Sequence, residues 1–294
     1  ISESGTHEEL IEAKGIYQSL YKNKFEDSPA TRSVESSTKS LYVPRFDDEY
    51  NSSIVVDSWY KKSLWLYLLY PFALTISYLT SRRRRKFLKN VDLKYKSDIP
   101  LIIVGNLTIG GTGKTPLVKY IASELIKLGY SPGLVSRGYG GKFKETLSVT
   151  SETPVKLTGD EAQILSTLNI PFYIDKNRVR ALKALNKNHD CDIVISDDGL
   201  QHYNMNRDIE IVVIDGKRRF GNNLTFPAGP LRESIKRLTS VDFIVNNSGP
   251  TEEGEYLMNV SPSKFIHLKS GKSYPVEQWP MHKQVHAVAG LGNP

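Results

Sequence analysis

The feature that most constrains this chain is a glycine-rich loop between an apolar run and an amphipathic stretch. Residues 101–104 read Leu-Ile-Ile-Val, the loop occupies 105–113, and Lys114-Thr115 opens a segment with helical periodicity through residue 128. Strand, glycine-rich loop, Lys-Thr and helix in this order are typical of a P-loop, whose backbone N–H groups face a phosphate at a helix N-terminus. The chain is therefore expected to fold around a nucleotide-binding core.

Within the loop, backbone and side chains have separate expected roles. The residues expected to surround the phosphates are Gly110, Gly111, Thr112, Gly113, Lys114 and Thr115. Lys114 can reach β- and γ-phosphate oxygens, and the Thr115 hydroxyl can join the shell of a Mg²⁺ ion. Thr108 departs from the usual pattern, which has glycine at that position. The flanking strand and helix outweigh this departure, and a glycine-rich turn without a ligand would leave the Lys-Thr pair unexplained.

From residue 99 onward, short β-branched runs alternate with longer helical stretches. Strands are expected at 101–104, 133–136, 193–196, 209–214, 243–245 and 285–289, and helices are expected to begin at Lys114, Asp160 and Asn177. Continuous apolar strands spaced by helices imply a parallel sheet covered on both faces. The predicted fold class is α/β, with a P-loop NTPase-like, mostly parallel sheet, helices on both faces and a preceding N-terminal membrane-associated helix.

A second candidate site follows the apolar run at 193–196. This run ends in Asp197-Asp198, and Gly199-Leu200-Gln201-His202 comes next. In a Walker B strand the final aspartate lies in the shell of Mg²⁺, so Asp197 or Asp198 is expected to face the metal. An Asp-Asp-Gly sequence alone is more often a turn, and the P-loop upstream is what favours the metal site.

Further charged residues lie in sequences typical of loops. Asp160, before a helical stretch, either caps that helix or accepts the proton of an attacking sugar hydroxyl. Basic residues that are candidate clamps for phosphates, and that could instead form surface salt bridges, are Arg137, Arg178, Arg180 and Arg232.

An apolar segment over residues 64–80 is typical of a membrane helix. Trp59 and Trp65 lie at its start and the basic run 82–86 follows it. The segment is short for a span and Pro71 would kink it, so an in-plane anchor is an alternative, and a buried core helix is a third. As an anchor, it would place the basic run on the cytoplasmic side, against anionic headgroups.

Charge and cysteine content narrow the partners. The net charge of +7 indicates an anionic partner, and the single Cys191 suits a reducing compartment. Because the basic residues cluster behind an apolar helix and do not interleave with exposed aromatics, an anionic membrane surface is favoured over nucleic acid.

Residues 1–50 differ from the rest. Residues 1–25 resemble the last helix of the nucleotide-binding domain of a lipid-exporting ABC transporter, and a polar linker follows. No Walker motif precedes this piece, so we interpret it as a remnant that suggests a functional link to such a transporter. The alternative is an ordinary amphipathic helix with Thr6 as its cap and Glu9 completing a capping box.

Five motifs in a fixed order carry a specific resemblance. They are GNLTIGGTGKTP from Gly105, SRGYGG from Ser136, GDE from Gly159, DDGLQH from Asp197 and FPAGPLRE from Phe226. Over roughly residues 55–294 the chain resembles the tetraacyldisaccharide 4′-kinase family. The resemblance implies ATP and Mg²⁺ as cofactors, and phosphorylation of the 4′-hydroxyl of a tetraacylated glucosamine disaccharide 1-phosphate. In that family this step of lipid A synthesis occurs at the cytoplasmic face of the bacterial inner membrane.

The resemblance also assigns residues. It matches Asp160 to the proposed catalytic base, Lys114 and Thr115 to the P-loop pair, and Asp197, Asp198 and His202 to further active-site positions. Two departures from the family pattern stand out. Ala162 replaces a frequent proline, and the chain stops at 288–294 inside a motif, so a C-terminal Asp-His segment that would orient the base is expected to be absent and turnover to be reduced.

The expected domains are a transporter-like remnant with its linker at 1–50, a membrane anchor at 54–90 and a P-loop kinase domain at 91–294. The alternative functions are a membrane-attached P-loop ATPase or switch protein, and an inactive fragment of the kinase.

Overall fold

The computed structural model describes residues 55–61, 63–267 and 270–276. The chain divides into two compact units, and the larger one contains Ser53–Pro262. In the smaller unit, strands β9 (Lys264–Ile266) and β10 (Ser273–Pro275) pair antiparallel. The transporter-like segment 1–25, its linker and the strand expected at 285–289 lie outside the described residues.

The larger unit is built on an eight-stranded sheet with the order β3-β4-β2-β5-β1-β6-β7-β8. Its strands are β1 (Leu101–Gly105), β2 (Pro132–Ser136), β3 (Leu147–Ser148), β4 (Phe172–Ile174), β5 (Ile193–Asp197), β6 (Ile209–Asp215), β7 (Phe243–Asn247) and β8 (Glu255–Met258). All neighbouring strands run parallel except β3 and β4. Because β1 lies between β5 and β6, the loop that follows β1 opens at the point where ligands bind in open α/β sheets.

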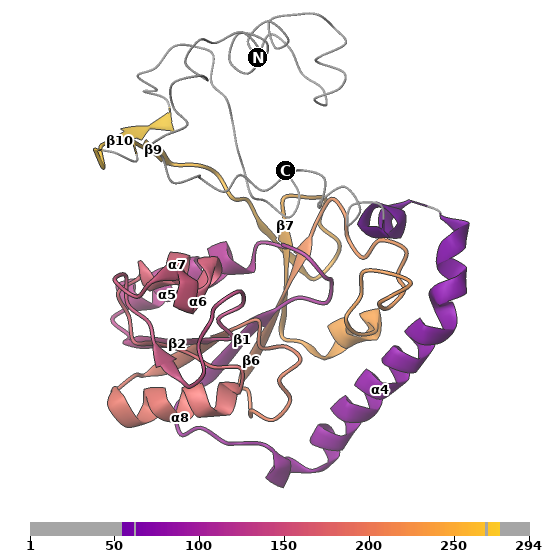
Figure 1. The fold of residues 1–294 in the computed structure, drawn as a ribbon, viewed down its shortest axis with the longest axis horizontal. Helices are drawn as coiled ribbons and strands as arrows, with labels where there is room; N and C mark the ends of the chain where they lie inside the picture. Colours follow the sequence, from indigo (N-terminus) through magenta and orange to yellow (C-terminus); the bar gives the residue numbers. More distant parts are fainter. Residues whose placement is uncertain (1–54, 62, 268–269, 277–294) are drawn as a thin grey trace, which may run out of the picture. The chain divides into compact units, whose positions relative to one another are not determined.

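Helices cover both faces of this sheet (Figure 1). They are α5 (Lys114–Lys127), α6 (Val155–Thr158) and α7 (Asp160–Ser166), together with α8 (Arg178–Asn188). Ile102 and Val104 of β1 lie in one apolar cluster with residues of α5 and α7, whereas Leu101 and Ile103 lie in another with residues of α8. This two-sided burial explains the unbroken apolar strands and confirms the predicted α/β class.

The helix starts agree closely with the sequence. Helices α5 and α7 begin at the predicted residues, Lys114 and Asp160. Helix α8 begins one residue after the predicted Asn177, because Asn177 is its N-cap and accepts a hydrogen bond from the Val179 backbone N–H at 3.1 Å.

The apolar segment after residue 63 forms two consecutive helices, η2 (Leu64–Leu69, a 3₁₀ helix) and α4 (Tyr70–Lys89). Pro71 lies in the first turn of α4, where a missing backbone N–H costs nothing. The proline marks the change from 3₁₀ to α geometry, and the kink expected at Pro71 stays a prediction. Short 3₁₀ helices η3 (Val91–Leu93) and η4 (Ile235–Ser240) occur further along the chain.

Helix α4 has an unusual distribution of side chains. Ala73 is buried, and its carbonyl accepts a hydrogen bond from the Thr225 hydroxyl at 2.9 Å. The half-buried positions that continue this stripe at helical spacing are Ile76, Ser77, Thr80, Ser81, Arg84 and Phe87. Large apolar side chains point outward, with Phe72 63% and Leu79 55% exposed.

Among the described residues, one continuous helical segment, Leu64–Lys89, which joins η2 and α4, is long and apolar enough to cross a membrane. Only 11% of its most apolar 18-residue window is buried. A core helix would bury most of that window, so the core-helix alternative does not fit the part of the chain that the structure describes.

Candidate active site

The glycine-rich loop lies at the carboxyl end of β1 and leads directly into α5. Gly110 and Gly113 adopt positive φ values of 108° and 92°, which favour glycine. A Cβ atom on Gly113 would lie 2.5 Å from Nδ2 of Asn247, which itself donates to the Thr112 carbonyl at 3.2 Å. The end of β7 therefore fixes the second half of the loop, and a side chain at position 113 would displace it.

The first half of the loop pairs with the segment that carries Arg232. The Ile109 N–H donates to the Pro230 carbonyl at 2.8 Å, and the Arg232 N–H donates to the Leu107 carbonyl at 2.6 Å. Thr108 forms an isolated antiparallel bridge with Leu231 and is 5% exposed. Because position 108 is extended and paired, a β-branched residue suits it, which explains the departure from the usual P-loop pattern.

Asp198 connects the loop lysine to the Arg232 segment. Its Oδ1 lies 3.8 Å from Nζ of Lys114, and its two carboxylate oxygens accept from Nη1 of Arg232 at 3.0 and 3.3 Å. Burial raises the pKa of Asp198, but Lys114, Arg232 and Arg178 outweigh burial and hold that pKa below its ordinary value. Asp198 also has φ of 49°, an uncommon conformation for a non-glycine residue.

Asp197, one residue earlier, is in the opposite electrostatic situation. It is 1% exposed, its Oδ2 accepts from the Ser136 hydroxyl at 3.3 Å, and its Oδ1 has no hydrogen-bond partner. Burial raises its pKa to about 6, with Lys114 opposing the shift and Asp198 and Glu161 adding to it. An acceptor oxygen that is buried and unpaired is the kind of group that a bound cation would satisfy.

The Arg178 side chain donates hydrogen bonds to the backbone of this pair of aspartates. It is fully buried and donates to the carbonyls of Asp197 and Asp198 at 3.3 Å and to that of Asp175 at 3.2 Å. Burial lowers its pKa to about 10. The surface-salt-bridge alternative is wrong for Arg178, which holds the Asp197-Asp198 turn in shape. That alternative fits Arg180, 58% exposed and 2.8 Å from Asp175.

His202 lies among positive charges. Burial lowers its pKa to about 4, and Arg178, Arg137 and Arg83 add to this effect. Its imidazole is therefore neutral at pH 7 and can accept a hydrogen bond. Arg137 is exposed in the loop after β2.

Asp160 is exposed at the first helical position of α7, and Gly159 occupies the N-cap. The interpretation of Asp160 as a helix cap is therefore wrong by one residue. Gly159 has φ of 80°, and a Cβ there would lie 1.9 Å from the Tyr139 carbonyl oxygen. The loops that carry Asp160 and Arg137 thus pack backbone to backbone, which requires glycine. The role of Asp160 as a base stays a prediction.

Several contacts to the loop come from residues that sequence reasoning did not single out. Asn106 donates to the Gly110 carbonyl at 3.2 Å, Gln201 donates to the Asn106 carbonyl at 3.2 Å, and Arg218 reaches the Gly111 carbonyl at 3.4 Å. Asn106 and Gln201 stand inside motifs that the sequence displays. Arg218 and Asn247 carry no local signal, because only the tertiary fold brings them to the loop.

The residues present fit a magnesium ion that arrives with a nucleotide. Among the described residues, no group of three or more His, Cys, Asp or Glu side chains could hold a metal alone. Mg²⁺ usually takes one or two protein ligands and completes its shell with phosphates and water. The half-buried Thr115 hydroxyl and the unpaired Oδ1 of Asp197 are donors of the required oxygen type.

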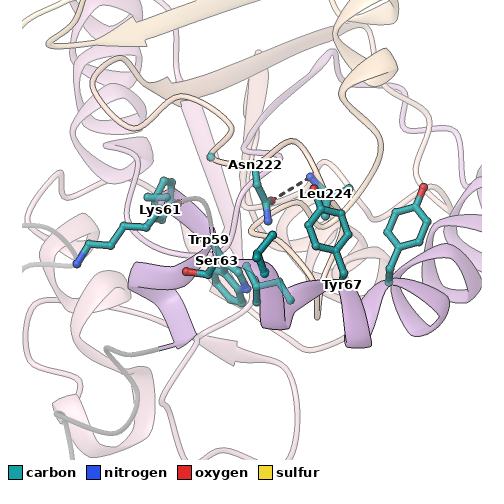
Figure 2. Close-up of a pocket in the computed structure, with 11 residues that line it drawn as sticks. Trp59, Lys61, Ser63, Tyr67, Asn222 and Leu224 are labelled. Carbon is teal, nitrogen blue, oxygen red and sulfur yellow. Dashed lines mark hydrogen bonds between the residues drawn. The ribbon is translucent and has the colours of Figure 1, made fainter.

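An apolar pocket of about 750 Å³ opens beside the start of η2 (Figure 2). Its lining is mostly aromatic and aliphatic and comprises Trp59, Tyr60, Lys61, Ser63, Leu64, Leu66, Tyr67, Tyr70, Gly221, Asn222 and Leu224. Asn222 accepts from the Leu224 N–H at 3.1 Å within one wall. The Arg218 guanidinium lies 5.4 Å from the ring centroid of Tyr60, so a residue that reaches the P-loop contacts one of the residues that line this pocket.

These features define a P-loop nucleotide-binding protein. They are the mostly parallel sheet, the glycine-rich loop between β1 and α5, and the strand β5, at whose end two consecutive aspartates lie beside the loop lysine. Residues 65–294 match the family described as LpxK, tetraacyldisaccharide-1-P 4′-kinase. This match covers more than half of the chain, and the chain belongs to that family.

Individual relatives agree with this assignment. The chain is 41% identical over 237 residues to a tetraacyldisaccharide 4′-kinase of Shewanella denitrificans, covering 80% of this chain and 71% of the relative. It is 42% identical over 236 residues to one of Vibrio campbellii, covering 80% and 69%. A crystal structure of an "apo" form of LpxK from Aquifex aeolicus in complex with ATP superimposes with a TM-score of 0.63 at 26% identity, covering 73% of this chain and 70% of that one. The family match begins at residue 65, so the transporter resemblance of residues 1–25 stays a prediction.

Proposed function

We propose that this protein transfers the γ-phosphate of ATP to the 4′-hydroxyl of a tetraacyldisaccharide 1-phosphate. The observation that carries the proposal is the convergence of Lys114, Asp198 and Arg232 at the carboxyl end of β1 in a chain of this kinase family. Phosphoryl transfer depends mainly on positioning and on charge stabilisation, and this cluster supplies both.

The nucleotide phosphates are assigned to the N-terminus of α5. Backbone N–H groups of residues 110–115 would face them, and Lys114 would exchange its contact with Asp198 for the β- and γ-phosphate oxygens. Thr115 and Asp197 would hold Mg²⁺, which neutralises charge that develops on the phosphates. Arg137 and Arg232 are assigned to the phosphates of either substrate, Asp198 and His202 to further active-site roles, and buried Arg178 to shaping the turn beneath them.

In the transfer step, the 4′-oxygen forms a bond to the γ-phosphorus as the bond from that phosphorus to the ADP oxygen breaks. The proton of the 4′-hydroxyl passes to a carboxylate, and Asp160 is assigned as that base. Asp160 is exposed at the start of α7, on a loop packed against the Arg137 loop, so its carboxylate is free to receive a substrate.

The acyl part of the acceptor calls for an apolar surface. The outward face of α4 and the pocket beside η2, which precedes α4, provide such a surface. Leu64 and Tyr67 of η2 line this pocket and are 80% and 66% exposed. We assign the outward face to the membrane and the basic run 82–86 to anionic headgroups at the cytoplasmic face of the inner membrane.

The test is a transfer assay with ATP radiolabelled at the γ-phosphate and the disaccharide 1-phosphate in mixed micelles. Parent protein is compared with Lys114→Ala and with Lys127→Ala, a matched change at the other end of α5, where Lys127 forms a surface ion pair with Glu124. We expect label in the glycolipid for the parent and for Lys127→Ala, and almost none for Lys114→Ala. Label that appears only as inorganic phosphate, whether or not acceptor is present, would instead identify an ATPase or switch protein.

A further inference from the structure

A buried hydrogen bond joins two loops of the candidate site, the loop that carries His202 and the loop that carries Arg232. Tyr203 follows His202 in the chain, and Glu233 follows Arg232. The Tyr203 hydroxyl donates to Oε2 of Glu233, and these residues are 6% and 5% exposed. The positions of His202 and Arg232 are therefore linked through their neighbours.

A network of charges surrounds this pair. Arg237, 3% exposed, donates to Oε1 of Glu210, which also accepts from Arg207 at 2.6 Å. Arg207 also donates to the carbonyls of Leu200 and His202, and its guanidinium lies 5.2 Å from the Tyr203 ring centroid. The network thus holds the backbone of the His202 loop as well as the Tyr203 ring.

Helix α4 contacts both ends of this network. Phe87 stacks on Tyr203 with ring centroids 6.5 Å apart and planes inclined by 29°. Arg84 donates to the Ser240 hydroxyl at 2.7 Å, and that oxygen also accepts from Arg237 at 2.8 Å. Arg84 also lies close enough to Glu233 for its charge to lower the pKa of that carboxyl, against the larger opposing effect of burial.

These contacts set Arg84 apart from the other residues of the basic run. Arg84 is half-buried, and its Nε is buried without a partner, whereas Arg82, Arg83, Arg85 and Lys86 are exposed. Burial of a guanidinium costs free energy because it removes water from the charge. A residue that served only to attract headgroups would gain nothing in return for this cost.

We infer that Arg84 and Phe87 of α4 are positioning residues for phosphoryl transfer. Phe87 acts through Tyr203 and its hydrogen bond to Glu233, and Arg84 acts through Ser240 and Arg237 on the charge network that holds the His202 loop. This inference rests on the proposed function for its kinetic consequence. One peptide unit separates Glu233 from Arg232, so a shift at Glu233 moves the guanidinium that contacts Asp198. Displacements of about 1 Å at a reacting site cost up to about a hundredfold in rate.

The test separates this role from membrane attraction by comparing Arg84→Gln with Arg85→Gln. Each variant removes one charge of the basic run, so affinity for vesicles that contain anionic phospholipid should fall by up to about fivefold at about 1 kcal/mol per charge, and by no more in half-buried Arg84→Gln than in exposed Arg85→Gln. At saturating vesicle concentration, kcat for glycolipid phosphorylation should be about tenfold or more lower in Arg84→Gln than in Arg85→Gln. Equal kcat values in the two variants would overturn the inference.

A second measurement needs no acceptor lipid. Tyr203→Phe removes only the hydroxyl that joins the loops, and we expect faster amide hydrogen exchange in peptides over 199–207 and 228–234, with exchange in α8 unchanged. Unchanged exchange in both loops, or a uniform increase that includes α8, would overturn the inference. If the parent transfers no label to glycolipid but the loops respond as expected, the proposed function fails and the structural link stands.

Discussion

Replacing Asp197 by asparagine should stabilise the protein at neutral pH, although this carboxylate is assigned to the active site. Its pKa is raised from 3.8 to about 6 by burial, so keeping it ionised above pH 6 costs folding free energy. Asparagine keeps the shape and an oxygen for the Ser136 hydroxyl, but it carries no charge.

The magnitude follows from linkage. Below pH 3.8 the group is protonated in the folded and in the unfolded state and has no effect. Between pH 3.8 and 6 only the folded state keeps the proton, so stability falls as the pH rises. The difference between 3.8 and about 6 corresponds to a cost on the order of 3 kcal/mol above pH 6. Asp197→Asn should recover most of this free energy, less the cost of a buried amide N–H₂ without a full set of acceptors.

The assay is urea unfolding followed by circular dichroism at a series of pH values from 4 to 8, without nucleotide. Asp198→Asn is the matched control, because the pKa of Asp198 is lowered and its charge stabilises the fold. The unfolding free energy should rise in Asp197→Asn and fall in Asp198→Asn at pH 8. The gain in Asp197→Asn should shrink toward pH 4, whereas the loss in Asp198→Asn should persist down to pH 4, because the stabilising charge of Asp198 is lost only below pH 3.8. A loss of stability in Asp197→Asn at pH 8, or a gain independent of pH, would refute the electrostatic argument.

Further predictions concern the loop, the base and the anchor. Lys114→Ala should lower kcat by orders of magnitude with an unchanged circular dichroism spectrum, and a normal kcat would remove Lys114 from the site. Asp160→Asn should reduce kcat at least about a hundredfold while nucleotide affinity and thermal stability stay unchanged, whereas equal activity would return Asp160 to a structural role. Gly113→Ala, strained at φ of 92° and against Asn247, should weaken nucleotide binding at least about tenfold in a fluorescence titration, and parental affinity would contradict the observed loop geometry. Phe72→Ser with Leu79→Ser should move the protein from the membrane to the soluble fraction without altering its thermal unfolding, and a lowered Tm would show that this face packs on protein.

Most of the fold could be predicted because the central strands are buried on both faces. Strands β1, β2, β5 and β6 are buried along most of their length, and the sequence predicts these four and the less buried β7 within two residues of their observed ends. Strands β3, β4 and β8 have only two to four residues, too few to show a period, and β3 runs antiparallel at the sheet edge.

The site was predictable where its residues follow one another in the chain and not where folding brings them together. Lys114 and Asp198 stand in recognisable motifs, and the structure places them in contact. The burial of Arg178 could not be predicted, because a guanidinium that donates to backbone carbonyls has the same local sequence as an exposed one. Asn247 lies 135 residues from the carbonyl that it binds. Neither the hydrophobic periodicity nor the composition of a sequence can predict a contact between residues so far apart in the chain.

The stripe of α4 that faces the protein has a consequence for which sequences the helix can tolerate during evolution. At Ala73, Ser77, Thr80 and Ser81 the constraint is side-chain volume. The backbone of α4 lies so close to the rest of the protein that the Thr225 hydroxyl donates a hydrogen bond to the Ala73 carbonyl. On the opposite face the constraint is polarity alone, and leucine, phenylalanine, isoleucine or tyrosine would serve equally at Phe72 or Leu79. Substitutions among relatives should therefore divide by position, with exchanges confined to small residues at Ala73, Ser77, Thr80 and Ser81 and free exchange among large apolar residues at Phe72 and Leu79.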